Sequence, residues 1–474
     1  MDKEKDLHEK PSLEFEVPDG GFEAWCTVFG ACVVWPLVQA SKLNQTDYYV
    51  RVYLPNHSPS SIAWIGSFQL MMPFFLGPIA GRIFDDGGFR LLEIVGGSIF
   101  TFSVFMLSLC KPGQYYQSEC SQAVGMGIGL GLTFVPTISI VVHHFKRHRG
   151  LTSGIVLSGS SLGATFFPIS VQLLPKLGFS NAIRASGALV PPCIVIGNLM
   201  MRTRLPPRSK REGNTPPLDI KSFFVDPAYM LGGLGTFLAL LGIYFPVVYI
   251  QLYAVQHNLD KNLAFYSVPI LNASGGIARV LANHLGDLYG PFNVQVVCSV
   301  ICGAVIWGMS GVNNGASLVV VSIIYGAASG AFLSLGFACF SSLAKGPEEV
   351  GARAGIALAL CSIGTLVSTP IQGALLTGAY HWIRPTAFAA VGVDTLVLMS
   401  FPLIQPLPDD DIRGSHAVCY HTNTESEGYW GLARIEKSIQ VIWFDTPIYL
   451  LCVYRISLKN CCKTRNIFSR PATG

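Results

Sequence analysis

Residues 154–163 read GIVLSGSSLG and residues 355–364 read GIALALCSIG, so a Gly-Ile pair and a later glycine recur at a spacing of 201 residues. Pro168 and Pro370 extend the match at a spacing of 202 residues. Several matches at a nearly constant spacing indicate that the chain contains two related halves.

The composition around this repeat is that of a membrane protein. Half of the 474 residues are hydrophobic and only 13% are charged, whereas a soluble domain carries about 25% charged residues. A helix needs about 20 apolar residues to cross the hydrocarbon of a bilayer, and it satisfies its backbone polar groups internally. Apolar runs of this kind lie near residues 22–40, 61–80, 91–110, 121–142, 151–174, 182–201, 228–252, 263–282, 292–310, 316–343, 354–376 and 385–405.

These runs and the repeat predict an all-α membrane protein with 12 transmembrane helices in two pseudo-symmetric six-helix bundles. The N-terminal bundle is expected over residues 19–201 and the C-terminal bundle over residues 228–407. Three segments are expected in the cytoplasm: a tail at 1–18, a basic, proline-rich linker at 202–227 and a tail at 408–474.

The distribution of lysine and arginine between the loops predicts the orientation. With the N-terminus in the cytoplasm, thirteen of these residues fall in inner loops and seven in outer loops. Such an excess is typical of cytoplasmic loops, so both termini are expected inside, with the plasma membrane as the location. The sequons at Asn44 (NQT) and Asn56 (NHS) would then be external glycosylation sites, or they are chance occurrences.

The stretch GPIAGRIFDDGGFR, residues 77–90, resembles the loop between the second and third helices of the major facilitator superfamily. Asp86 departs from that pattern, because it stands where a basic residue is usual. A related stretch, DLYG at 287–290, follows the DDGG of this loop by 202 residues. The resemblance implies a latch that closes the cytoplasmic faces of the two halves; the alternative is a solvated glycine-rich turn. The latch residues would be Gly81, Asp85, Arg90 and Asp287.

A second stretch, PDGGFEAWCTVFGA at residues 18–31, resembles the start of the first helix in the monocarboxylate porter family. LLGIYFP at 240–246, with Tyr249, is similar to the seventh helix of the fungal branch of that family, and the similarity runs from about residue 18 to 405. Within the first stretch, Gly20 and Gly21 permit a tight turn and Asp19 can cap the following helix. The stretch is therefore a structural anchor or, alternatively, a substrate contact.

Charges inside a membrane are functional candidates. The resemblance places an arginine in the eighth helix, where Arg279 would clamp a carboxylate or serve the latch. Animal members of the family carry an Asp one turn earlier, and here that position is Gly275. Lys42 is either linked to substrate or interfacial. The substrate-binding candidates are Arg279, Asn272, Tyr244, Tyr249 and Lys42. Further side chains expected in the lining are Phe29, Phe134, Phe245, Tyr325, Phe332 and Gln69.

Two acidic residues bear on proton coupling. Asp394, in the twelfth helix, is a candidate proton carrier or a structural pairing partner. Glu93 begins the third helix, and we expect it to be solvated at the interface. The coupling ion therefore stays open.

These features predict a secondary active transporter that moves a small organic anion, such as a monocarboxylate, by alternating access. The alternatives are efflux of a fungal secondary metabolite, uptake of a vitamin-like solute and a nutrient sensor derived from a transporter. An enzyme is not expected, because no catalytic triad or metal-ligand spacing occurs. The expected partners are a small, carboxylated solute and the lipid bilayer, with no cofactor, metal or nucleic acid, and the oligomeric state stays open.

Overall fold

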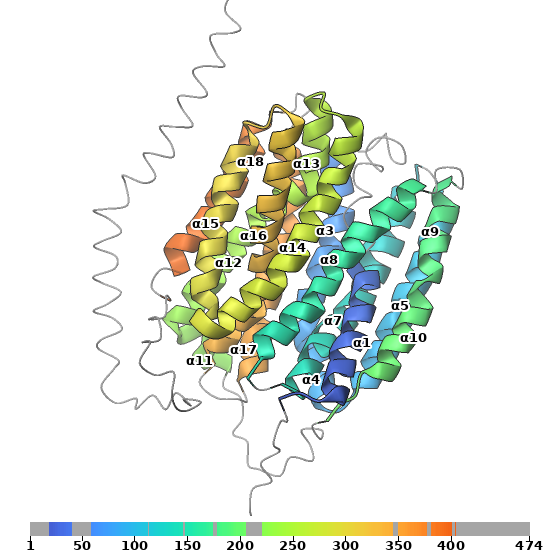
Figure 1. Cartoon of the computed structure of the whole chain (residues 1–474), viewed down its shortest axis with the longest axis vertical. Helices are drawn as coiled ribbons and strands as arrows, with labels where there is room; N and C mark the ends of the chain where they lie inside the picture. The colour runs from blue at the N-terminus through green and yellow to red at the C-terminus, as the bar shows by residue number, and fades with distance from the viewer. Residues whose placement is uncertain are drawn as a thin grey trace, which may run out of the picture.

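The computed structural model describes residues 19–39, 58–111, 113–145, 147–173, 178–204, 220–344, 349–376, 381–400 and 403 (Figure 1). In the first half the helices are α1 (Phe22–Gln39), α3 (Pro59–Phe75), α4 (Gly77–Asp85), α5 (Phe89–Leu109), α6 (Tyr115–Ser118), the π-helix η2 (Glu119–Met126), α7 (Gly127–Val142), α8 (Arg149–Leu173), α9 (Gly178–Ala188) and α10 (Val190–Met200). In the second half they are α11 (Ile220–Val225), α12 (Pro227–Gly242), α13 (Phe245–Gln256), α14 (Lys261–Tyr289), α15 (Pro291–Met309), α16 (Gly315–Ser342), α17 (Val350–Leu376) and α18 (Ile383–Ser400).

The helices confirm the predicted fold class. Where consecutive helices such as α3 and α4 continue one another, they count as one segment, and twelve long segments then correspond to the twelve predicted runs. Among the described residues, nine of these stretches are long and apolar enough to cross a membrane. The other three are α1, whose apolar part is short, α8, which is rich in glycine and serine, and α14, which contains several glycine, serine and asparagine residues.

The two polar helices lie at the contact between the halves. α8 of the first half packs along α14 of the second, and α3 packs along α17 in the same way. A helix that is surrounded by other helices needs fewer apolar side chains than one that faces lipid, because its small and polar residues pack against protein and are not exposed to hydrocarbon. Their low hydropathy therefore follows from their position between the halves.

Each half has its own apolar core. One cluster of buried residues runs from Ala24 to Met201, and the other draws on the second half from Phe223 to Leu396, joined by Leu70. In Figure 1 the blue-to-green half stands beside the yellow-to-orange half. The two bundles thus pack internally and meet along the α8–α14 and α3–α17 pairs.

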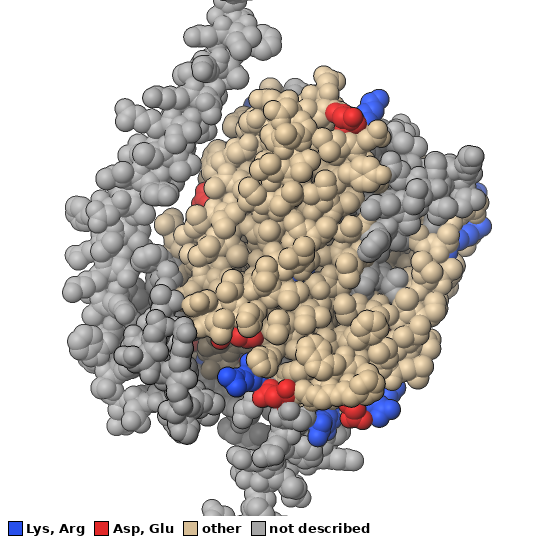
Figure 2. Space-filling view, in the orientation of Figure 1, with Lys and Arg blue, Asp and Glu red and all other residues tan. Residues whose placement is uncertain are grey.

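Charged side chains are concentrated at the two ends of the molecule. Figure 2 shows Lys, Arg, Asp and Glu mainly towards the top and bottom of the visible face, with few charged side chains, at its edges, in the broad band between them. This distribution is expected when the middle of the protein lies in hydrocarbon. We call the lower end in Figure 1, where α1, α5, α8 and α17 begin, the basal end.

Candidate solute-binding site

A cavity of about 100 Å³ lies between the two halves. Pockets for drug-sized solutes have volumes of roughly 300–1,000 Å³, so the cavity is contracted in this conformation. Both halves contribute to its wall, through α3, α7 and α8 on one side and α13, α14 and α16 on the other.

Arg279, on α14, is the one charged residue among those that line the cavity. Its Nε atom is buried without a hydrogen-bond partner, and its Nη1 donates a long hydrogen bond of 3.4 Å to the carbonyl oxygen of Leu157. No carboxylate of the described residues forms an ion pair with it. Because a buried charge without a partner is costly, this guanidinium is suited to bind an anionic group that enters the cavity.

The packing of α14 explains why Arg279 has no acidic partner one turn earlier. At Gly275, a Cβ atom would lie 2.9 Å from the carbonyl oxygen of Gly326 on α16. The backbones of α14 and α16 therefore approach too closely for any side chain at this position. An aspartate could be accommodated here only if the two helices moved apart.

A break between α12 and α13 brings Tyr244 into the wall. Pro246 has no N–H and cannot continue the hydrogen-bond ladder. The carbonyl oxygens of Leu241 and Ile243, next to the break, accept hydrogen bonds from side chains of other helices. The donors are Ser368, Gln372 and Tyr325. Broken helices whose polar backbone is satisfied by neighbours are typical of solute sites in transporters.

The remainder of the wall is partly apolar. Phe74 and Phe134 pack edge to face with ring centroids 5.1 Å apart. Asn272 lines the second half, and its Nδ2 donates to the carbonyl oxygen of Val268 at 2.9 Å. The cavity therefore presents a cationic group on one side and aromatic rings on the other, which suits an organic anion with an apolar body.

Three of the five predicted substrate-binding residues, Arg279, Asn272 and Tyr244, line this cavity. Tyr249 lies outside it: its hydroxyl donates to the carbonyl oxygen of Thr369 at 3.0 Å and ties α13 to α17. Lys42, Asn44 and Asn56 fall outside the described residues.

Among the further residues expected in the lining, only Phe134 is found there. Phe29 is 59% exposed on the outside of α1. Gln69 accepts a hydrogen bond from Nε2 of Gln122 at 3.4 Å within the first half. The others are buried in the core of the second half: Phe245, Tyr325 and Phe332.

The two acidic residues considered for proton coupling, Asp394 and Glu93, do not line the cavity. Asp394 accepts a hydrogen bond from Nε1 of Trp307 at 3.4 Å, between α18 and α15 and away from the cavity. Glu93 is completely buried, so the expectation of a solvated side chain was wrong. Its carboxyl group packs between α5 and α7, where Thr137 contacts it at 2.7 Å.

One predicted latch residue bridges the two halves at the basal end. Asp287, near the end of α14, accepts hydrogen bonds from the backbone N–H groups of Gly150 and Leu151, at 3.1 and 3.0 Å. These belong to the first turn of α8, where a carboxylate satisfies free donors and the helix dipole. The other half thus caps α8.

The remaining predicted latch residues lie at the same end. Asp85 ends α4, which packs against α17 of the other half. Arg90 donates to the carbonyl oxygen of Asn198 at 3.4 Å and so ties α5 to α10 within the first half. Gly81 faces Val135 of α7, also within the first half.

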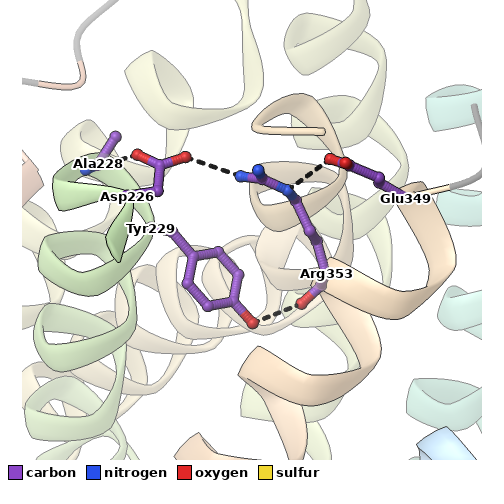
Figure 3. Close-up of polar contacts among 5 residues, drawn as sticks. All are labelled: Asp226, Ala228, Tyr229, Glu349 and Arg353. Carbon is purple, nitrogen blue, oxygen red and sulfur yellow. Dashed lines mark hydrogen bonds and ion pairs between the residues drawn. The ribbon is translucent and has the colours of Figure 1, made fainter. Parts of the chain in front are cut away.

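A buried cluster around Arg353, on α17, was not predicted from the sequence (Figure 3). Arg353 has no exposed surface, and its guanidinium lies 2.8 Å from a carboxylate oxygen of Asp226 and 3.0 Å from one of Glu349. The hydroxyl of Tyr229 donates to the Arg353 carbonyl oxygen at 2.9 Å, and the ring of Phe223 packs 4.7 Å from the guanidinium carbon. The cluster therefore fixes α11 and the start of α12 to α17.

The glycine-rich start of α1 makes a comparable connection in the first half. The φ angles of Asp19, Gly20 and Gly21 are all positive, at 45°, 148° and 102°. Glycine adopts positive φ angles readily, which suits positions 20 and 21. The Asp19 carboxylate accepts a hydrogen bond from the backbone N–H of Arg147 at 2.6 Å, just before α8. The motif thus connects the start of α1 to the start of α8, as an anchor does.

Comparisons with known proteins agree with this architecture. Residues 24–369 match the sequence profile of the Major Facilitator Superfamily. The fujikurins efflux protein of Gibberella fujikuroi is 35% identical over 384 residues, covering 79% of this chain and 81% of that protein. The aspyridones efflux protein apdF of Emericella nidulans is 33% identical over 379 residues, covering 79% and 76%. The solved structure of the nucleoside transporter NupG has a similar fold, with a TM-score of 0.60 at 13% identity over 80% of this chain and 98% of that one.

Proposed function

This chain belongs to the Major Facilitator Superfamily, and we propose that it exports an acidic small organic solute, a fungal secondary metabolite, by alternating access. Two relatives that are 33% and 35% identical to it are named as efflux proteins, one for aspyridones and one for fujikurins. We place the basal end in the cytoplasm and the protein in the plasma membrane, because its loops carry more lysine and arginine on that side.

The observation that carries the proposal is the guanidinium of Arg279 in the cavity wall without an acidic partner. A solute with a carboxylate or an ionised enol supplies the missing negative charge through charge-assisted hydrogen bonds. The aromatic pair Phe74 and Phe134 would receive its apolar body.

Alternating access requires that the contacts between the halves open at one end at a time. We propose that Asp287, bound to the first turn of α8, is the latch that holds the basal end closed. Gly81, Asp85 and Arg90 would support it from the first half. When this contact breaks, α8 and α14 can separate and admit solute from the cytoplasm.

Transport of a short monocarboxylate is the second candidate. The contracted cavity, of about 100 Å³, supports it because the space suits a small acid better than a polyketide-sized metabolite. The resemblance of residues 18–31 to the monocarboxylate porter family supports the same solute class. Arg279 would bind the carboxylate in either case.

Transport assays on arginine variants test the proposal. The full chain is produced in a yeast that lacks related exporters, and inside-out vesicles are supplied with labelled lactate or labelled acidic metabolites of a producing fungus. Arg279→Met removes charge-assisted hydrogen bonds of about 1.5–3 kcal/mol, so we expect roughly a 10- to 100-fold weaker apparent affinity. Arg279→Lys keeps the charge but loses the two-pronged geometry, so we expect an intermediate loss.

The control is Arg184→Met, on α9, whose side chain donates to Ser108 at 3.2 Å outside the cavity. This variant should transport normally. Unchanged kinetics in Arg279→Met would refute the role of the guanidinium, and transport of lactate alone would favour the monocarboxylate reading.

A further inference from the structure

Glu93 is a carboxyl group inside the membrane part of the protein that plays no role in the solute site. It lies on α5 four residues after Phe89, about 6 Å from the basal start of the helix. Its side chain is completely buried, and one carboxyl oxygen, Oε2, has no hydrogen-bond partner. Glu93 does not line the cavity, but α7, which contacts Glu93 through Thr137, also carries the lining residue Phe134.

A count of hydrogens determines which form of Glu93 this site accommodates. The Thr137 hydroxyl oxygen lies 2.7 Å from Oε1 of Glu93 and 2.6 Å from the carbonyl oxygen of Thr133. A hydroxyl has one hydrogen and can donate one such bond fully. Both contacts become good hydrogen bonds if Glu93 carries a proton and donates it to Thr137 while Thr137 donates to Thr133. If Glu93 is ionised, Thr137 can donate its one hydrogen either to Glu93 or to Thr133. The other of these two short oxygen–oxygen contacts then has no hydrogen between its atoms.

Among the described residues, none that surrounds Glu93 balances a negative charge. α7 has no titratable residue between Gly127 and Val142, and none of the titratable or charged groups on the elements packed against α5 bonds to Glu93. Within the described residues these groups are Arg82 and Asp85 on α4, Arg90 on α5 itself, Glu119 and Cys120 on η2, Arg184 on α9, Cys193 on α10, and His143 and His144 after α7. A buried carboxylate without a cation, and with only the shared hydroxyl of Thr137 as a donor, is unfavourable.

The side chain of Glu93 has no exposed surface, and the backbones of α5 and α7 approach each other closely one turn further along. A Cβ atom at Gly96, one turn after Glu93, would lie 2.7 Å from Thr133 and 2.9 Å from the carbonyl oxygen of Gly129. Hydration of an ionised Glu93 therefore requires α5 and α7 to separate at the basal end. Because α7 also forms part of the cavity wall, this separation would change the solute site.

We propose that Glu93 is a proton-binding site of the transporter, which holds a proton while α5 and α7 are packed and releases it to water at the basal end when they separate. No other bond forms or breaks in this step. The site makes the packing of the cavity wall depend on the pH at the basal end. This inference rests on the α5–α7 contact and not on the identity of the solute, so it stands or falls separately from the export of an acidic metabolite.

Infrared difference spectroscopy on the full chain in lipid, without solute, tests the protonation directly. We expect a carbonyl band of a protonated carboxyl at neutral pH that is absent in Glu93→Gln and present in Asp394→Asn, the matched change at the other membrane carboxyl. A Glu93→Gln spectrum identical to wild type at neutral pH would show that Glu93 is ionised and would overturn the proposal.

The unfolding temperature provides the second measurement. Glutamine at position 93 has the shape of a protonated glutamate and, like it, offers a hydrogen-bond donor. The folded state binds one proton more than the unfolded chain, in which glutamate ionises near pH 4.3, so raising the pH favours unfolding of wild type. From about pH 5 to about pH 9, the unfolding temperature should fall more steeply for wild type than for Glu93→Gln. Parallel curves for the two proteins would also overturn the proposal.

Discussion

The Arg353 cluster gives a prediction whose size can be worked out from its contacts. Asp226 has two roles: one carboxylate oxygen pairs with the Arg353 guanidinium at 2.8 Å, and the other accepts from the N–H of Ala228 at 3.1 Å, capping α12. A hydrogen bond to a charged group contributes about 1.5–3 kcal/mol, and an N-cap about 1 kcal/mol. Asp226→Ala should therefore lower the free energy of unfolding by about 2.5–4 kcal/mol.

The variant Asp226→Asn separates the two roles. Asparagine caps a helix as well as aspartate does, so only the charged contact is lost, and the expected cost is about 1.5–3 kcal/mol. Glu349→Gln should cost less, about 0.5 kcal/mol, because this pair joins residues four apart at the start of α17, and the Glu349 side chain is 26% exposed to water.

Chemical denaturation in mixed micelles measures these differences, and a double-mutant cycle isolates the pair. Arg353→Met keeps the packing beside Phe223 while removing the charge, and the remaining carboxylates can be hydrated because they are 19% and 26% exposed. We expect the cycle with Asp226→Asn to give a coupling energy of about 1.5–3 kcal/mol. Additive single changes, or equal losses for Asp226→Ala and Asp226→Asn, would refute the reasoning.

Two further variants probe the contacts that position the solute site. Asp287→Ala removes the cap that the second half places on Gly150 and Leu151, so spin labels on α8 and α14 should report a basal-open population that is roughly tenfold larger; an unchanged distance distribution would contradict the latch. Gly275→Ala puts a Cβ 2.9 Å from the Gly326 carbonyl oxygen and should destabilise the fold by about 1–3 kcal/mol. Gly233→Ala, where nothing lies within 4 Å of the new atom, should change stability by less than about 0.5 kcal/mol in the same assay; equal effects would count against the close approach of α14 and α16.

The sequence predicted the helices well because apolar runs of bilayer length are a local signal. The site was predicted in part. Arg279 could be found because a charge in such a run is conspicuous, and the predicted residues Asn272 and Tyr244 line the same cavity. Tyr249 was expected beside Tyr244, but five residues turn a helix by about 500°, which leaves the two side chains about 140° apart.

Other features depend on contacts between distant residues. Asp226 and Arg353 are 127 positions apart, and nothing local shows that they pair. Glu93, by contrast, had a signal that a closer reading would have found. Gly96, Gly97 and Phe100 follow it by three, four and seven residues, so Glu93 shares the face of α5 that packs most tightly. The position of Glu93 near the start of an apolar run suggested a side chain at the membrane interface. Its side chain is buried because it lies on the face of α5 that packs against α7.

Gly275 also has a consequence for the charge that the transporter moves. A partner aspartate one turn from Arg279 would leave the empty site neutral, but the close contact of α14 with α16 excludes that side chain. In this chain the empty site therefore carries one positive charge, and binding of a monoanion neutralises it. An unpaired buried charge is costly, so a bound anion would stabilise the closed site relative to the empty one. Under the proposed export of an acidic solute, the solute would thus favour its own transport by completing the ion pair that the helix packing leaves open.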